Sequence, residues 1–181
     1  MEGAQADRTE AGGDAGLPTY SKTITFDSPV ETGRLLSLAR EDREFAGGAH
    51  GNSLFGGVIW DKAMKRRIPA AGLFRPGAGL APLDAALCAA VNREKQSRDG
   101  AAPVRADGGQ WSCPRAASTP FVLAPGDEPG KAGGLTFLIA PYQVGPYAEG
   151  SYEVTVPQAV FRDLVAPAWA DEFAGRPAAS A

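Results

Sequence analysis

The stretch from Gly134 to Val156 constrains the fold most, because it holds two strand patterns joined by a tight loop. Its first part, GLTFLIA, is a continuous apolar run with the length and composition of a strand. In its last part Tyr152, Val154 and Val156 alternate with polar residues, which is the period of a strand with one buried face. The stretch therefore predicts a hairpin of two antiparallel strands.

The loop of this hairpin is framed by residues with special backbone preferences. Gly145 and Gly150 permit a positive φ, and Pro146 fixes its own φ, so the loop must fold tightly. We interpret all three as structural residues and expect at least one of the two glycines to have a positive φ. Tyr142 precedes this turn, and Tyr147 lies at its apex.

Together with three other stretches, this hairpin carries a resemblance to a known family. The four stretches are Phe45–Asn52 (FAGGAHGN), Trp60–Asp61 with Gly72–Phe74 (GLF), Gly134–Val156, and Phe161–Leu164 (FRDL). The sequence resembles the C-terminal extracytoplasmic domain, of unknown function, that is shared by the anti-sigma-V factor (a lysozyme receptor) and peptidoglycan deacetylase C. The matches follow the family's order from about Leu35 to Gly175.

The resemblance implies a location as well as a fold. It implies export, so we expect a periplasmic or otherwise extracytoplasmic protein, with a lipoprotein anchor as one route to the envelope. Residues 1–3 open a polar, acidic segment and not a signal peptide, so we expect that a signal or lipoprotein leader has been removed. The resemblance also implies that Gly47 and Gly48 are structural residues of a loop that follows a strand.

A length of 181 residues predicts one domain. Residues 1–18 are mostly Gly, Ala, Asp and Glu, with almost nothing to bury, and predict a disordered leader. We place the single domain at 19–175 and a free tail at 176–181.

The segment after the first predicted strand, Tyr20–Phe26, has two interpretations. Ser28–Glu31 has the form of a helix capping box with proline at the first helical position, which predicts a helix through Leu38. The alternative is a turn over 27–33 followed by a long strand, Leu35–Phe45. A glycine inside the segment weakens the helix, and the resemblance implies a strand, so we favour the strand.

The remaining patterns complete an α+β fold. Leu83, Leu87 and Val91 recur at helical spacing within a predicted helix, Leu80–Ser97. Further strands are predicted at 53–60, 66–68 and 119–123, and a short helix at 158–164. Strands, a helix, strands and a short helix in this order predict an antiparallel, meander-like sheet with both helices packed on it. Leu83, Leu87 and Val91 should share the core with Leu135, Phe137, Ile139, Val154 and Val156.

Four residues are candidates for ligand binding: His50, Tyr142, Tyr147 and Glu149. His50, the only histidine, is either an acid–base group beside Asp61 or Glu149 or a residue that holds its loop through hydrogen bonds. The tyrosines form either an exposed aromatic patch or a clamp on the hairpin. We assign no catalytic residue.

Cys88 and Cys113 are the only cysteines. In an exported protein an even number of cysteines favours a disulfide, and the alternative is two unpaired thiols. One histidine and two distant cysteines are too few ligands for zinc, so we predict no metal site. No nucleotide or cofactor motif is present, and we predict no cofactor.

Charge and hydropathy narrow the classes of partner. A net charge of −3 does not favour a nucleic-acid partner. No run approaches the roughly 18 apolar residues of a spanning helix, so we predict no membrane span. We interpret the chain as a non-catalytic binding or sensing module of the bacterial cell envelope whose ligand is unidentified.

The resemblance makes a lysozyme-type protein a candidate partner for this module. The alternative function is a cell-wall or carbohydrate hydrolase that uses Glu149 with Asp61 or His50. A pocket that brings these groups together would favour the hydrolase.

Overall fold

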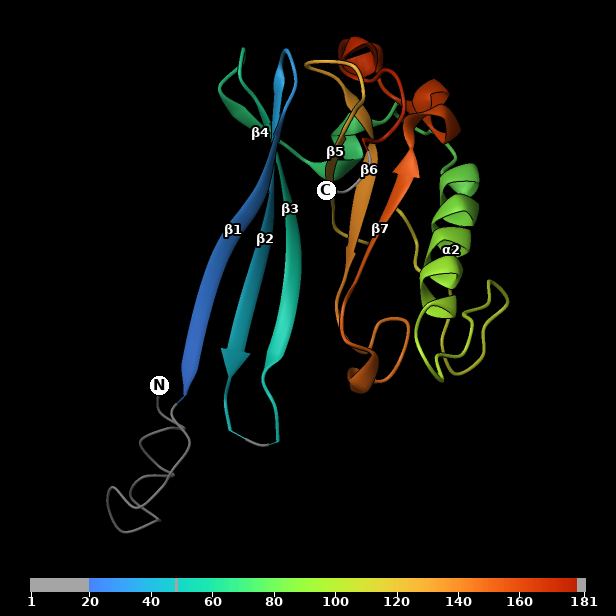
Figure 1. The fold of residues 1–181 in the computed structure, drawn as a ribbon. Helices are drawn as coiled ribbons and strands as arrows, with labels where there is room; N and C mark the ends of the chain where they lie inside the picture. The colour runs from blue at the N-terminus through green and yellow to red at the C-terminus, as the bar shows by residue number, and fades with distance from the viewer. Residues whose placement is uncertain (1–19, 48, 179–181) are drawn as a thin grey trace.

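The computed structural model describes residues 20–47 and 49–178, and it shows an α+β fold with two antiparallel sheets (Figure 1). The first sheet has the order β1 (Ser21–Glu31), β2 (Leu35–Phe45), β3 (Asn52–Asp61) and β4 (Arg66–Ile68). The second sheet has the order β5 (Phe121–Pro125), β6 (Ala132–Ile139) and β7 (Tyr152–Pro157). The helix is α2 (Ala81–Gln96), and the 3-10 turns are η1 (Ala70–Leu73), η2 (Tyr147–Glu149), η3 (Gln158–Val160), η4 (Arg162–Leu164) and η5 (Pro167–Glu172).

The first sheet, the second sheet and α2 form three layers, and the predicted core residues lie between α2 and the second sheet. In Figure 1 the second sheet stands between α2 and the first sheet. All eight predicted core residues belong to one buried cluster, so this prediction is confirmed. Phe137 has no exposed surface and lies next to Phe121, with ring centroids 5.5 Å apart. Within the described ranges no helix is long and apolar enough to cross a membrane.

The strand interpretation of the contested segment is confirmed, and the capping-box helix is wrong. β2 spans Leu35–Phe45, as predicted. The predicted turn over 27–33 is too long, because β1 continues to Glu31 with a register shift between Asp27 and Val30. Pro29 lies within this irregularity, where an edge strand tolerates a residue that has no backbone N–H.

The two sheets touch where their backbones come closest. The Leu123 N–H donates to the buried Ser37 hydroxyl at 3.0 Å. A Cβ atom built on Gly57 would lie 1.9 Å from the Phe121 carbonyl oxygen, so only glycine permits this approach. The Gly56–Gly57 pair therefore marks a sheet-to-sheet contact.

Replacing Gly57 with alanine should destabilise the protein by about 1–3 kcal/mol, the range for overpacked sites. The neighbouring Gly56→Ala variant is a matched control, because the nearest atom to its new Cβ is on the flexible Arg40 side chain at 3.8 Å. Urea unfolding of both variants measures the difference. Equal midpoints for the two variants would show that the sheets do not meet at Gly57.

The C-terminal segment differs from prediction. The short helix predicted at 158–164 is two separate 3-10 turns, η3 and η4. The tail predicted to be free from Arg176 is bound as far as the structure describes it: the Ala178 N–H donates to the Pro125 carbonyl at 2.8 Å. The predicted leader 1–18, Gly48 and residues 179–181 lie outside the described residues.

Candidate functional site

A groove separates the two sheets on the side away from α2. Two adjoining sections of it, with volumes of about 580 Å³ and 540 Å³, share Ala39, Leu138 and Glu153 as lining residues. Each volume lies within the roughly 300–1,000 Å³ of ligand pockets in proteins. The groove is therefore large enough to hold a small ligand or a loop of a protein partner.

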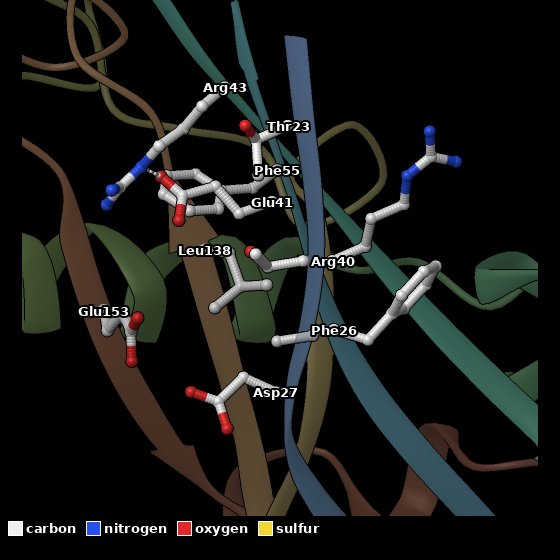
Figure 2. Close-up of a pocket in the computed structure, with 11 residues that line it drawn as sticks. Thr23, Phe26, Asp27, Arg40, Glu41, Arg43, Phe55, Leu138 and Glu153 are labelled. Atoms are coloured by element: carbon white, nitrogen blue, oxygen red, sulfur yellow. Dashed lines mark hydrogen bonds and ion pairs between the residues drawn. The ribbon is translucent and has the colours of Figure 1, made fainter.

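Strand alternation selects the residues that face the groove. Thr23, Thr25 and Asp27 of β1 lie opposite Arg43, Glu41 and Ala39 of β2, so all six share one face of the first sheet. Phe26 and Arg40, of the other parity, also contribute to the lining, but Figure 2 shows that their side chains extend toward the opposite face of the sheet.

Carboxylates outnumber cations in the groove. Asp27, Glu41 and Glu153 line it together with two cations, Arg40 and Arg43, and Arg40 is paired with Asp42 at 2.6 Å. Figure 2 shows the side chains of Asp27, Glu41, Arg43 and Glu153 around the apolar Leu138. Arg43 Nε donates to Glu41 Oε1 at 2.9 Å, so this ion pair offsets the charge of the guanidinium and that of the carboxylate alike. Glu153 has no ion-pair partner among the described residues. The lining therefore favours a basic ligand.

An aromatic cluster joins the sheets at the lower end of Figure 1, where the β2–β3 loop lies. The His50 ring stacks on Tyr147 with centroids 3.6 Å apart, and His50 Nε2 lies 3.2 Å from Tyr142 Oη. Tyr147 Oη donates to the Gly51 carbonyl at 3.1 Å. Three of the four candidate binding residues thus come together.

The aromatic cluster borders the groove. A further section of about 450 Å³ is lined by Thr23 and Arg43 of the groove and by Tyr147 of the cluster. Tyr142 is the more accessible tyrosine, with half of its surface exposed. The two tyrosines therefore act as a clamp between loops, and Tyr142 also presents an aromatic surface.

Glu149 faces the interior, away from these aromatic rings. Lys95 Nζ donates to Glu149 Oε2 at 2.5 Å and to the Val144 carbonyl at 2.8 Å. Tyr152 Oη donates to the same carboxylate oxygen, and the Arg98 guanidinium stacks on the Tyr152 ring at 3.6 Å. Glu149 is thus part of a hydrogen-bonded ion pair beneath the hairpin loop.

The ion pair shifts the pKa values of two groups. Burial raises the pKa of Glu149, but the hydrogen bonds from Lys95 and Tyr152 together with the nearby positive charges outweigh this effect, so its pKa lies below the usual value. Burial and the hydrogen bond to Glu149 raise the pKa of Tyr152 to about 12. Glu149 is therefore an ionised structural group and not a proton donor near neutral pH.

The loop glycines fit this arrangement. A Cβ atom on Gly145 would lie 2.2 Å from Glu149 Oε2, so glycine is required for the carboxylate to pack there. Gly150 has a φ of 73° and Gly47 a φ of 87°, conformations that favour glycine. Pro146, with a φ of −63°, caps the η2 turn that carries Tyr147 and Glu149.

Asp61 lies at the other end of β3 and has its own partners. Arg34 binds its fully buried carboxylate through two hydrogen bonds of 3.0 Å and 2.7 Å. The hydrogen bond from Arg34 lowers the pKa of Asp61 to about 2 against the opposing effect of burial, and the N–H groups of Met64 and Ala63 contribute. Within the described residues no hydrogen bond or ion pair joins Asp61, His50 and Glu149, and each has separate partners, so the geometry does not support the hydrolase.

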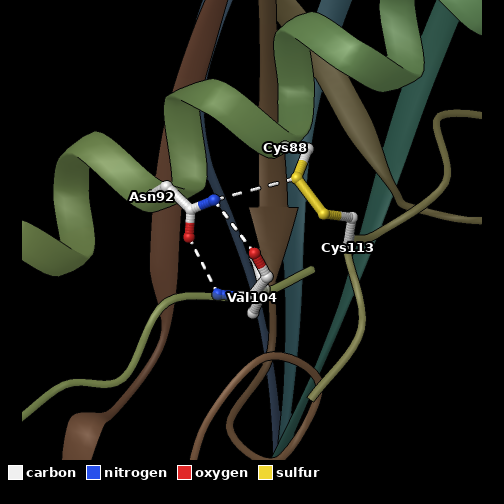
Figure 3. Close-up of a disulfide and its surroundings, with 4 residues drawn as sticks. All are labelled: Cys88, Asn92, Val104 and Cys113. Carbon is white, nitrogen blue, oxygen red and sulfur yellow. Dashed lines mark hydrogen bonds between the residues drawn. A yellow bond between two sulfur atoms is a disulfide. The ribbon is translucent and has the colours of Figure 1, made fainter. Parts of the chain in front are cut away.

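Cys88 and Cys113 form a disulfide with a Cα–Cα distance of 5.1 Å (Figure 3). Beside it, the Val104 N–H donates to Asn92 Oδ1 at 2.8 Å, and Asn92 Nδ2 donates to the Val104 carbonyl at 3.1 Å. The loop after α2 is thereby fastened to the helix at two neighbouring points.

The groove residues were not among the candidates from sequence. Its lining comes from β1, β2, β3, β5, β6 and β7 and from the C-terminal segment, and their proximity depends on how the two sheets dock. The sequence held one local signal. On one face of β1 and β2, polar residues such as Thr23, Glu41 and Arg43 occupy positions where a buried face would carry apolar residues.

Comparison with known proteins places this fold. The sequence model of the family described as "Protein of unknown function (DUF3298)" matches residues 71–159, from η1 through η3. No curated protein matches the chain.

Two solved structures share the fold. A DUF3298 family protein from Pseudomonas aeruginosa PAO1 aligns with a TM-score of 0.65 at 22% identity, over 96% of this chain and 72% of that chain. A member of the DUF3298 family from Bacteroides fragilis NCTC 9343 aligns with a TM-score of 0.66 at 21% identity, over 94% of this chain and 64% of that chain. The chain thus spans about two thirds of their lengths. It contains a match to the DUF3298 domain, whose function is unknown, and has the fold of solved DUF3298 proteins.

Proposed function

We propose that this protein is a non-catalytic binding module of the bacterial cell envelope and that the groove between its sheets is the ligand site. The excess of carboxylates around an apolar floor carries this proposal. Contacts between the sheets at Gly57 and between their loops at the stack of His50 on Tyr147 hold the two walls at a set separation. A preformed site costs little ordering when a ligand binds.

The disulfide and the family resemblance support the location and the kind of ligand. A disulfide between Cys88 and Cys113 is typical of proteins in oxidising compartments outside the cytoplasm. The resemblance to the anti-sigma-V lysozyme receptor makes a basic lysozyme of the animal type our candidate ligand. A basic loop of such a protein would meet Glu153 in the groove and would compete with Arg43 for Glu41. Opposite charges also speed association.

Calorimetric titration with a basic animal lysozyme at low salt tests this proposal. We expect the double variant Glu41→Gln/Glu153→Gln to bind roughly tenfold more weakly than the unaltered protein, equivalent to about 1.4 kcal/mol. The matched control is Glu128→Gln/Asp163→Asn, which removes the same charge from exposed positions outside the groove lining.

Two results would contradict the proposal. If the unaltered protein gave no binding heat and did not inhibit lysozyme, lysozyme would be excluded as the ligand. If the groove variant and the control variant lost the same affinity, the effect would be one of net charge, and the groove would not be the site.

A further inference from the structure

The β3–β4 hairpin is a basic segment in an acidic protein. Between Asp61 and Asp84 the chain carries five cations and no carboxylate, whereas the whole chain has a net charge of −3. Four of these cations lie in the hairpin, at Lys62, Lys65, Arg66 and Arg67.

Three of the four hairpin cations have no carboxylate partner within the described residues and can contact an anionic partner. Lys62 is neutralised, since its Nζ lies 2.5 Å from Glu31 Oε1. Lys65, Arg66 and Arg67 are exposed and form no ion pair within the part of the chain that the structure describes. Arg67 donates only to a backbone carbonyl, that of Gly57, at 3.0 Å.

Apolar side chains are exposed among these cations. Met64 is 57% exposed within the turn, and Trp60 is 38% exposed. Trp60 lies directly opposite Arg67 in the β3–β4 ladder. Large exposed apolar side chains beside several cations are typical of a surface that contacts both charged groups and hydrocarbon.

The turn that carries Met64 is held in one conformation. Asp61 Oδ1 accepts hydrogen bonds from the N–H groups of Ala63 at 3.0 Å and Met64 at 3.1 Å. Arg34 in turn fixes the Asp61 carboxylate. The chain reverses at Lys65, which has a φ of 50°. Met64 is therefore presented on a rigid tip, so little ordering entropy is lost when this tip meets a surface.

We propose that the β3–β4 hairpin docks on the surface of an anionic lipid bilayer. Lys65, Arg66 and Arg67 contact lipid phosphates, and Met64 enters the boundary between headgroups and acyl chains. A soluble polyanion would use the cations but would leave Met64 in water, and for this reason the hairpin fits a bilayer better. The hairpin and the β2–β3 loop lie at opposite ends of the first sheet in Figure 1, so docking leaves the aromatic end of the groove accessible.

Co-sedimentation with vesicles tests the proposal. We expect the whole chain to sediment with vesicles of equal parts phosphatidylcholine and phosphatidylglycerol, and not with pure phosphatidylcholine, with binding that falls as salt rises. Lys65→Gln/Arg66→Gln should reduce the partition coefficient roughly 10- to 30-fold. The control Arg93→Gln/Arg162→Gln removes the same charge from exposed positions on α2 and η4.

A second variant distinguishes a bilayer from a soluble polyanion. Met64→Ser should weaken vesicle binding and leave binding to polyphosphate unchanged. Equal sedimentation with neutral and anionic vesicles, equal losses in the hairpin and control variants, or a Met64→Ser variant that binds vesicles like the unaltered protein would each overturn the proposal.

Discussion

Replacing Lys95 with methionine is expected to lower the free energy of unfolding by about 3–5 kcal/mol, the cost of removing one partner of a buried ion pair. The Lys95 side chain is 1% exposed and that of Glu149 is 11% exposed, so water cannot replace the lost ammonium. Glu149 would keep the hydrogen bond from Tyr152 but would lose its counter-charge. Chemical denaturation at neutral pH measures the change.

A second substitution separates loss of charge pairing from loss of packing. Lys95→Met/Glu149→Gln removes both charges, and we expect it to recover most of the lost stability. Because the pKa of Glu149 is lowered by folding, the stability that Glu149 contributes is present at neutral pH and declines as pH falls through its folded pKa. The difference in free energy of unfolding between Lys95→Met and the unaltered protein should therefore shrink at acid pH. A single variant within 1 kcal/mol of the unaltered protein at pH 7 would contradict the assigned role.

Replacing Phe137 with alanine is expected to cost about 3–5 kcal/mol. Phe137 is fully buried and packs on the Phe121 ring, and the loss is a large part of the stability of a typical domain. Val160→Ala is the control, because Val160 is 38% exposed and should change stability by roughly 0.5 kcal/mol or less. Thermal unfolding measures the effect. A Phe137→Ala variant whose Tm lies within about a degree or two of that of the unaltered protein would refute the core assignment.

The layers around the core could be predicted because their signals are local. Leu83, Leu87 and Val91 recur at helical spacing, and Tyr152, Val154 and Val156 at strand spacing, so each pattern identified both the element and its buried face. The division of the strands into two sheets could not be predicted in this way, because it depends on which strands pair along their edges and no local sequence pattern records that pairing.

The buried ion pair of Glu149 could not be predicted for a related reason. A carboxylate in a Gly-Pro turn is usually solvated, and its partner Lys95 lies near the polar C-terminal end of α2, 54 positions away in the sequence. Yet Lys95 continues the buried stripe of Leu87 and Val91 at the next helical position, where a lysine must find a counter-charge. That position was the signal in the sequence.

The most direct test of the groove as the ligand site is an amide chemical-shift titration of the isotopically labelled protein with a basic animal lysozyme. We expect the shifts to concentrate at Thr23–Asp27, Ala39–Arg43, Leu138 and Glu153, with α2 unaffected. In Glu41→Gln/Glu153→Gln the same shifts should need roughly tenfold more lysozyme. Shifts confined to α2 or to the β3–β4 hairpin, or no shift at all, would contradict the assignment of the groove as the site that binds this ligand.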